Sequence, residues 1–241
     1  MAGTFIAFEG GEGSGKSTQS RLLYSRLIEE GHTSLLLHEP GGTALGEEVR
    51  RLLLVERGDA RRRRQARSNI APLAELLLFS AARAELVSSV LRPALQEGRV
   101  VVCDRYTDST IAYQGYGRGL PLETIDQANR LATGGLQPDL MVFLDIHPAD
   151  ALQRVSAQMS LLQEPGAQPG AIRQDEDGLR RFEREPMEFH QKVRQGYRDL
   201  SAAEPARWLV VDGSLPVEHI AALIWERVEP LVRGRGRDHQ S

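Results

Sequence analysis

A glycine-rich stretch near the N-terminus constrains this chain more than any other feature. Residues 10–18 read G-G-E-G-S-G-K-S-T and fit the pattern G-x-x-x-x-G-K-[ST] of a phosphate-binding loop. Its glycines leave out Cβ atoms, so backbone N–H groups can surround a phosphate. In this pattern the Lys16 ammonium meets the β and γ phosphates, and the Ser17 hydroxyl is a magnesium ligand. The residues predicted to bind the nucleotide phosphates are Gly10, Gly11, Glu12, Gly13, Ser14, Gly15, Lys16, Ser17 and Thr18.

The sequence on either side of this loop supports the motif. Residues 4–8 form a short apolar run that is typical of a buried parallel strand, and leucines at helical spacing follow from Lys16 to about Glu30. Lys16 and Lys192 are the two lysines among 30 basic residues, and the others are arginines. A lysine in the loop of such an arginine-rich chain indicates that the site needs a compact ammonium and not a planar guanidinium. A glycine-rich turn without a ligand is the disfavoured alternative.

Composition limits the class of protein. The chain has 241 residues, 41% of them hydrophobic, which predicts one α/β domain over residues 1–233 and a disordered tail over 234–241. The formal charge of -3 gives no general attraction to nucleic acid or membrane, and we expect neither as a partner. Cys103, the single cysteine, lies in an apolar run and is expected to be buried and inert. The chain shows no secretory signal and no apolar run of 18 residues, so we expect a cytoplasmic protein.

Four more apolar runs follow, at residues 34–37, 100–103, 140–144 and 208–211, separated by helical patterns. This alternation predicts a parallel sheet with helices on both faces. Ligands of such sheets bind at the carboxyl ends of the strands, so the segments after each run are expected to face the phosphate-binding loop.

The segments after the second run are rich in arginine. A helix after residues 39–43 carries Arg50, which either clamps a substrate phosphate or lies in solvent; spacing does not separate the two. Residues 57–67 form a dense cationic run within a basic insert at about 56–68, and a solvated loop is favoured there over a polyphosphate or nucleic-acid patch. Pro72 then opens a long helix to about Leu95, on which Phe79 and Arg83 lie four residues apart on one face.

Charged residues follow the third and fourth runs. Asp104 ends an apolar strand, where a carboxylate commonly holds magnesium, and Arg105 would point a guanidinium at phosphate. An ion pair between these two neighbours is the weaker alternative. Residues 159–178 are rich in Gln, Pro and Gly, which predicts a flexible lid at about 157–181 that closes over the phosphates and delivers an arginine. A disordered surface insertion is the other interpretation.

Four motifs together resemble bacterial thymidylate kinases over nearly the whole chain. They are F-E-G-G-E-G-S-G-K-S-T at 8–18, E-P-G-G-T at 39–43, L-F-S-A-A-R at 78–83 and D-R-Y-T-D-S-T-I-A-Y-Q at 104–114. The resemblance implies the three-layer P-loop NTPase fold with a five-stranded parallel sheet, a homodimer, and phosphoryl transfer from ATP with Mg²⁺ to dTMP. It implies dTMP contacts for Glu9, Arg50, Phe79, Arg83, Arg105, Ser109, Thr110, Tyr113 and Gln114.

The resemblance also assigns roles at these positions. Glu9 is expected at the deoxyribose 3′-hydroxyl, Arg50 and Arg105 at the phosphate, and Phe79 against thymine, with Arg83 at a thymine carbonyl. Ser17 and Asp104 are expected to hold Mg²⁺, with Lys16, Arg105 and Arg181 as catalytic residues. Two departures from the family pattern are a phosphate-binding loop without the arginine that some members carry and a long lid whose usual arginine-glycine pair is replaced around Gln158 and Met159. The basic insert at Arg61 to Arg64 is also outside that pattern, and its role stays open. The candidate lid arginines are Arg154, Arg173, Arg180 and Arg181.

A monophosphate acceptor also agrees with the chemistry. Its oxygen is already anionic near neutral pH, so attack on the γ-phosphoryl needs alignment and charge neutralisation, not a general base. Another nucleoside monophosphate kinase, a deoxynucleoside kinase, and a nucleotide-binding switch are the alternatives. A panel of acceptor nucleotides separates them.

Overall fold

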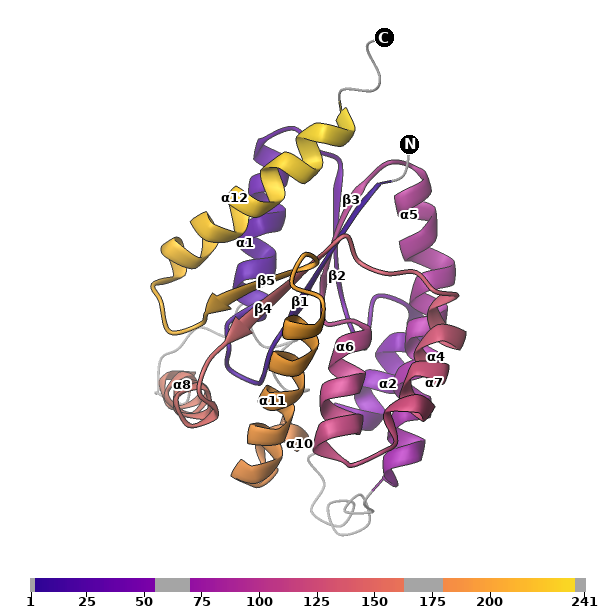
Figure 1. The fold of residues 1–241 in the computed structure, drawn as a ribbon, viewed down its shortest axis with the longest axis vertical. Helices are drawn as coiled ribbons and strands as arrows, with labels where there is room; N and C mark the ends of the chain where they lie inside the picture. The colour runs from indigo at the N-terminus through magenta and orange to yellow at the C-terminus, as the bar shows by residue number, and fades with distance from the viewer. Residues whose placement is uncertain (1–2, 55–69, 163–179, 237–241) are drawn as a thin grey trace.

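The computed structural model describes residues 3–54, 70–162 and 180–236. Its sheet has five parallel strands in the order β2-β3-β1-β4-β5, which confirms the predicted fold class (Figure 1). The strands are β1 Thr4–Glu9, β2 Ser34–His38, β3 Val100–Asp104, β4 Leu140–Asp145 and β5 Trp208–Asp212. The helices are α1 Lys16–Glu29, α2 Ala44–Leu54, α4 Pro72–Leu86, η1 Val87–Leu91, α5 Arg92–Gln96, α6 Thr107–Thr110, η2 Ile111–Gly117, α7 Leu122–Thr133, α8 Pro148–Leu162, α10 Arg180–Glu183, α11 Met187–Ala203 and α12 Val217–Gly236.

The sheet is the middle of three layers. Successive side chains of a strand point to opposite faces, so β1 places Phe5 and Ala7 in one hydrophobic cluster and Ile6 and Phe8 in another. The first cluster is completed by residues of α2, α4, η2 and α11, and the second by residues of α1 and α12. Burial on both faces explains why the central strands read as unbroken apolar runs.

The predicted long helix from Pro72 continues to Gln96 but changes its hydrogen-bond pattern on the way. Residues Val87–Leu91 form a π-helical turn, η1, between α4 and α5. Pro93 follows at once, and a proline has no N–H to donate and crowds the preceding turn. A π-turn is one of the known ways for a helix to accommodate such an interruption.

Two predicted boundaries need correction. Residues 159–162, predicted to belong to the flap, are helical instead, because α8 extends to Leu162. The tail predicted from residue 234 is helical to Gly236, since α12 extends that far. The basic insert at 56–68 and residues 163–179 of the predicted lid lie outside the described residues.

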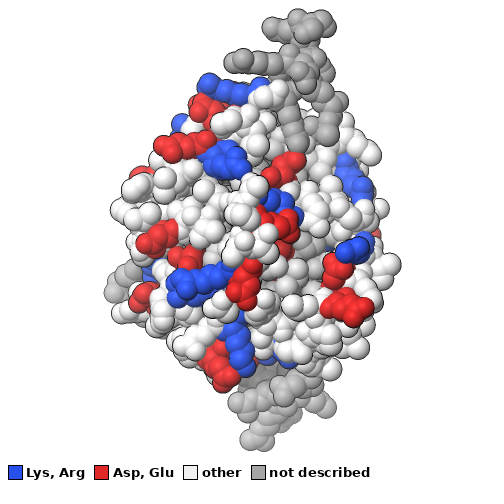
Figure 2. Space-filling model, in the orientation of Figure 1, with Lys and Arg blue, Asp and Glu red and all other residues white. Residues whose placement is uncertain are grey.

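The surface carries charges of both signs. On the face in Figure 2, basic and acidic side chains are interspersed without a continuous field of one sign. Among the described residues, no helix is both long and apolar enough to cross a bilayer. Cys103 is buried, as predicted, and burial raises the pKa of its thiol well above the ordinary value.

Candidate active site

The phosphate-binding loop lies between β1 and α1, as the motif requires. Gly15 precedes α1 with a φ of 95° and Gly13 has a φ of 69°, backbone conformations that glycine adopts without steric cost. A Cβ on Gly13 would lie 2.3 Å from the carbonyl oxygen of Ala151, so α8 packs directly against the loop there. Gly11 differs, because its φ is not left-handed and the space beside it is open.

Lys16 is folded back over its own loop. Its Nζ donates hydrogen bonds to the carbonyl oxygen of Gly11 at 2.6 Å and to Ser14 Oγ at 3.3 Å. Burial lowers the pKa of the Lys16 ammonium to about 8, and the nearby Arg105 guanidinium acts in the same direction. The loop therefore holds a cation in a desolvated position, where an incoming phosphate would stabilise its charged form.

Ser17 and Asp104 meet across the loop. The Ser17 hydroxyl donates a hydrogen bond to Asp104 Oδ2, and Asp104 Oδ1 is buried without a hydrogen-bond partner among the described residues. A buried carboxylate oxygen without a partner is costly unless a cation or water satisfies it. A hydroxyl beside a carboxylate is an oxygen donor set of the kind that Mg²⁺ prefers, so these residues fit the ion.

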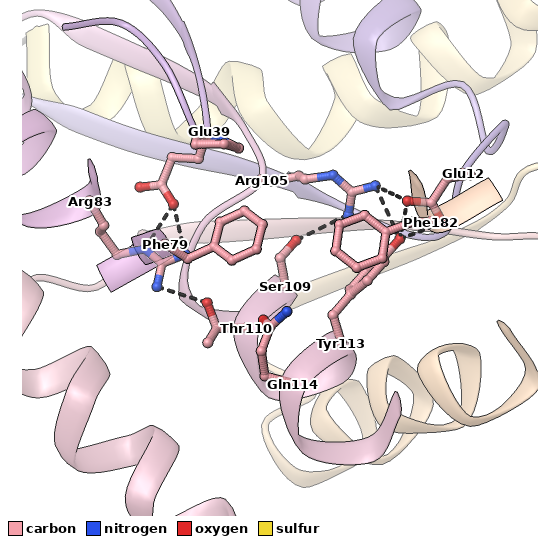
Figure 3. Close-up of a pocket in the computed structure, with 11 residues that line it drawn as sticks. Glu12, Glu39, Phe79, Arg83, Arg105, Ser109, Thr110, Tyr113, Gln114 and Phe182 are labelled. Carbon is pink, nitrogen blue, oxygen red and sulfur yellow. Dashed lines mark hydrogen bonds and ion pairs between the residues drawn. The ribbon is translucent and has the colours of Figure 1, made fainter. Parts of the chain in front are cut away.

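A cavity opens beside the loop (Figure 3). Its lining consists of Glu12, Glu39, Pro40, Phe79, Arg83, Arg105, Ser109, Thr110, Tyr113, Gln114 and Phe182. Most residues predicted to contact dTMP are in this lining, although they come from two separate segments of the chain, 79–83 and 105–114. Glu9 and Arg50 are not in it. We call the part lined by Phe79, Arg83, Thr110 and Gln114 the base end.

Arg105 joins the loop to the cavity. Its Nη1 donates to the Gly10 carbonyl oxygen at 3.2 Å, while Nη2 lies 3.0 Å from Glu12 Oε1 and 3.1 Å from the Tyr113 hydroxyl. Its own backbone has a φ of 74°, an uncommon conformation for a residue with a side chain. Strain of this kind is found at sites where the position of a side chain matters.

Glu9 lies beneath the cavity lining. Its carboxylate accepts hydrogen bonds from the Tyr106 N–H at 2.9 Å, from the Ser109 hydroxyl and N–H, and from the Tyr197 hydroxyl at 2.8 Å. Burial raises the pKa of Glu9, and these hydrogen bonds oppose that shift. Glu9 thus fixes the backbone that carries Arg105 and Ser109, and Glu12 is the carboxylate of the loop that reaches the cavity.

Arg83 is held from several sides at the base end. Its Nε donates to Glu39 Oε2 at 2.8 Å, and Nη1 donates to Thr110 Oγ1 at 2.9 Å and to Asn129 Oδ1 at 2.8 Å. Its Nη2 donates to the Tyr106 carbonyl oxygen at 3.1 Å. The side chain is 2% exposed, so its guanidinium plane is fixed before any ligand arrives.

Arg50 contacts the cavity wall through the backbone of Pro40. Its Nη1 donates to the carbonyl oxygen of Pro40 at 3.2 Å, and Pro40 lines the cavity. The peptide bond between Glu39 and Pro40 is cis. Arg50 therefore lies next to the wall that the E-P-G-G-T motif forms.

The arginines proposed for the lid are placed differently from one another. Arg181 Nη2 lies 2.7 Å from Glu75 Oε2, close to the base end. Arg154 on α8 donates to the Gly213 carbonyl oxygen at 2.8 Å, next to the phosphate-binding loop. The side chains of Arg173 and Arg180 lie outside the described residues.

Several site residues were not predicted from the sequence. Glu75 is fully buried and contacts Gln114, Arg118 and Arg181. A signal for it exists, because Glu75 lies four residues before Phe79, which lies four before Arg83, and so Glu75 shares their helical face. Phe182, whose ring centroid lies 6.4 Å from that of Phe79, gives no comparable signal in its arginine-rich segment.

Comparisons with known proteins agree on one family. The family model for thymidylate kinase matches residues 8–224. A thymidylate kinase of Synechococcus sp. is 49% identical over 226 residues, covering 94% of each chain. One of Dehalococcoides mccartyi is 46% identical over 228 residues, covering 95% of this chain and 96% of that protein. A crystal structure of thymidylate kinase from Ehrlichia chaffeensis superposes with a TM-score of 0.69 at 31% identity, covering 95% of this chain and 100% of that one.

Proposed function

Because this chain belongs to the thymidylate kinase family, we propose that its glycine-rich loop and its cavity hold ATP and dTMP end to end. The activity itself is that of a dTMP kinase, which transfers the γ-phosphoryl group of ATP to dTMP and gives ADP and dTDP. What we add is an assignment of roles to the residues of this chain.

The position of Arg105 carries the proposal. One of its nitrogens contacts Gly10 of the phosphate-binding loop and the other contacts groups that line the cavity. A guanidinium at that junction neutralises charge on both sides as two anionic nucleotides approach each other. Lys16 supplies a second cation on the ATP side.

Inside the cavity, different lining residues would contact the base, the sugar and the phosphate of the acceptor nucleotide. Phe79 offers a ring for the thymine to stack on, with Arg83, Thr110 and Gln114 at its polar edge. Tyr113 and Ser109 lie between the base end and Arg105, where the deoxyribose and its phosphate would be. Arg50 supports this wall through Pro40.

Mg²⁺ would be held by Ser17 and Asp104. When bound with ATP, the ion neutralises phosphate charge. The hydrogen bond between Ser17 and Asp104 keeps the two oxygen donors side by side, and Asp104 Oδ1, which has no hydrogen-bond partner within the described part of the chain, is open to a ligand. Of the candidate lid arginines, Arg154 lies near the phosphate-binding loop, whereas Arg181 forms an ion pair with Glu75.

We also propose a homodimer, with its surface on α2 and α4. These helices lie next to each other (Figure 1), and they expose Leu45 and Leu52 on α2 and Leu73 and Leu77 on α4. Large apolar side chains gathered in this way on a surface are typical of a protein interface.

An acceptor panel tests the proposed function. The wild-type protein is incubated with ATP, Mg²⁺ and dTMP, dUMP, UMP, CMP, AMP or thymidine, and both ADP and the phosphorylated acceptor are measured. We expect dTMP to be the preferred acceptor and thymidine to be inert, because Arg105 needs an acceptor phosphate to bind. Efficient phosphorylation of thymidine, or equal rates with UMP and dTMP, would contradict the proposal.

A further inference from the structure

A buried carboxylate stands directly behind the base end of the cavity. Glu75 on α4 is 0% exposed, and its Oε1 accepts a hydrogen bond from Gln114 Nε2 at 2.7 Å. Arg118 Nε lies 3.2 Å from the same oxygen, and Arg181 Nη2 lies 2.7 Å from Oε2. A carboxylate paired with two guanidinium groups has no hydrogen to donate, so the arm of Gln114 that faces it must be the NH₂ group.

This contact fixes the direction of the Gln114 carboxamide. The group is planar, so a committed NH₂ arm turns the carbonyl oxygen to the other side. Gln114 is 1% exposed and lines the cavity, and Figure 3 shows its side chain reaching toward that space from η2. Among the described residues nothing donates a hydrogen bond to its carbonyl. The cavity therefore receives a hydrogen-bond acceptor from Gln114.

The base end also supplies a hydrogen-bond donor. Thr110 Oγ1 already accepts a hydrogen bond from Arg83 Nη1 at 2.9 Å, so its own hydrogen is available to a ligand. The Arg83 guanidinium beside it holds Thr110 in place but has no free hydrogen, because its N–H groups already face Glu39, Thr110, Asn129 and Tyr106. An acceptor from Gln114 and a donor from Thr110 form a defined pattern.

We propose that Glu75 selects the class of pyrimidine that the cavity accepts, by holding the Gln114 amide with its carbonyl toward the base. The inference rests on the proposed function, in which this cavity binds the base of the acceptor nucleotide. Thymine and uracil carry an N–H at N3 and a carbonyl at C4, whereas cytosine has a bare N3 and an amino group at C4. The fixed pattern matches the first pair and opposes cytosine at both positions. Glu75 is thus a positioning residue for specificity.

Replacing Glu75 with glutamine should reverse the Gln114 amide. The new side chain has one carbonyl oxygen. The short Arg181 contact of 2.7 Å favours placing that oxygen at the former Oε2, at the expense of the longer Arg118 Nε contact of 3.2 Å to the former Oε1. Its NH₂ group then faces Gln114, which turns its own carbonyl toward it and its NH₂ group into the cavity. Volume and shape hardly change, so the variant alters mainly hydrogen-bond direction.

The experiment measures kcat/KM for dTMP, dUMP and dCMP with the wild type and Glu75→Gln. We expect the preference for dTMP over dCMP to fall by about tenfold or more, with dUMP following dTMP, because a site built around hydrogen bonds rejects a mismatched group strongly. An unchanged ratio of dTMP to dCMP in a folded Glu75→Gln variant would overturn the inference. A loss that is equal for the three substrates would do the same, since it indicates a purely structural role.

Two further variants keep the test decisive. Arg118→Gln removes one cation from Glu75 but leaves the Gln114 contact and the Arg181 ion pair, so the substrate ratio should stay at the wild-type value. Gln114→Met removes both arms of the amide at similar volume, and it should lower the dTMP preference even if Glu75→Gln does not fold. Retention of the full preference in Gln114→Met contradicts the inference.

The wild-type control separates this inference from the proposed function. If the wild type phosphorylates none of the pyrimidine monophosphates, the function itself is wrong. If the wild type prefers dTMP and the variants keep that preference, only the role of Glu75 is wrong.

Discussion

At the scale of single residues, the buried lysine of the phosphate-binding loop determines how the site responds to pH. Lys16 is 6% exposed, and the pKa of its ammonium is lowered to about 8, first by burial and then by Arg105. Below that pH the ammonium is charged and ready for a phosphate. Above it, binding of an anionic nucleotide must take up a proton.

The affinity for ATP should therefore weaken as pH rises. We expect the Kd of a non-hydrolysable ATP analogue to increase by up to about tenfold per pH unit above pH 8, and to be nearly constant from pH 6.5 to 7.5. Titration calorimetry between pH 6.5 and 9.5 measures this dependence. Lys16→Met should bind weakly at every pH without that slope, and a wild-type Kd that is flat to pH 9.5 would refute the assignment.

The lowered pKa of Lys16 also affects the stability of the folded state. A lysine with a lowered pKa in the folded state binds its proton more tightly in the unfolded chain, so it disfavours folding at pH 7 and less so as pH rises from about 8 to its ordinary value. Bound nucleotide removes that cost because phosphate stabilises the charged form. The loop is thus more stable with its ligand than without it.

At the scale of elements, the packing of α8 against the loop depends on a missing side chain. Gly13 has a φ of 69°, and a Cβ there would lie 2.3 Å from the backbone oxygen of Ala151. Because backbone atoms cannot yield as a flexible side chain does, Gly13→Ala must push α8 away from the loop. We expect a loss of about 1–3 kcal/mol in unfolding free energy and a fall in kcat/KM of about 100-fold or more.

Gly11 offers a matched control for this prediction. It lies two residues away in the same loop, yet its φ is not left-handed and nothing occupies the position of its Cβ. Gly11→Ala should change the unfolding free energy by less than about 0.5 kcal/mol. Denaturant unfolding of the two variants gives the comparison, and equal losses would mean that α8 does not constrain the loop.

The strands also show how accurately the bounds of elements can be predicted from the sequence. The apolar runs predicted all five strands, but each strand extends one residue further, to Glu9, His38, Asp104, Asp145 and Asp212. Those residues still pair with their neighbours, since backbone hydrogen bonding does not depend on the polarity of the side chain. A hydrophobic pattern therefore ends one residue before the strand itself, at the carboxyl edge of the sheet, where the site lies.

The sequence motifs predicted most of the residues that line the cavity, but not the buried groups that orient those residues. Phe79, Arg83 and Gln114 belong to segments with a recognisable pattern, and the structure brings them together. Glu75 lies on the same helical face, yet a single carboxylate in a leucine-rich helix does not reveal that it is buried against Gln114 and two arginines. That contact joins residues 39 positions apart, and only the packing of η2 on α4 creates it.

At the scale of the whole molecule, the proposed dimer depends on the exposed leucines of α2 and α4. A twofold interface presents the same patch from both subunits, so one substitution alters it twice. Leu77 on α4 is 56% exposed in the single chain. Replacing it with glutamate would place two carboxylates at the interface, where each loses hydration without a partner.

Leu77→Glu should therefore shift the protein from dimer to monomer, with the dissociation constant raised by about 100-fold or more. Sedimentation equilibrium over a range of protein concentrations measures the change. Ile28→Glu is the matched control, because Ile28 is 48% exposed on α1, on the opposite face of the sheet, and should leave the dimer intact. A wild type that sediments as a monomer at all concentrations, or an equal effect of both variants, would show that α2 and α4 do not form the interface.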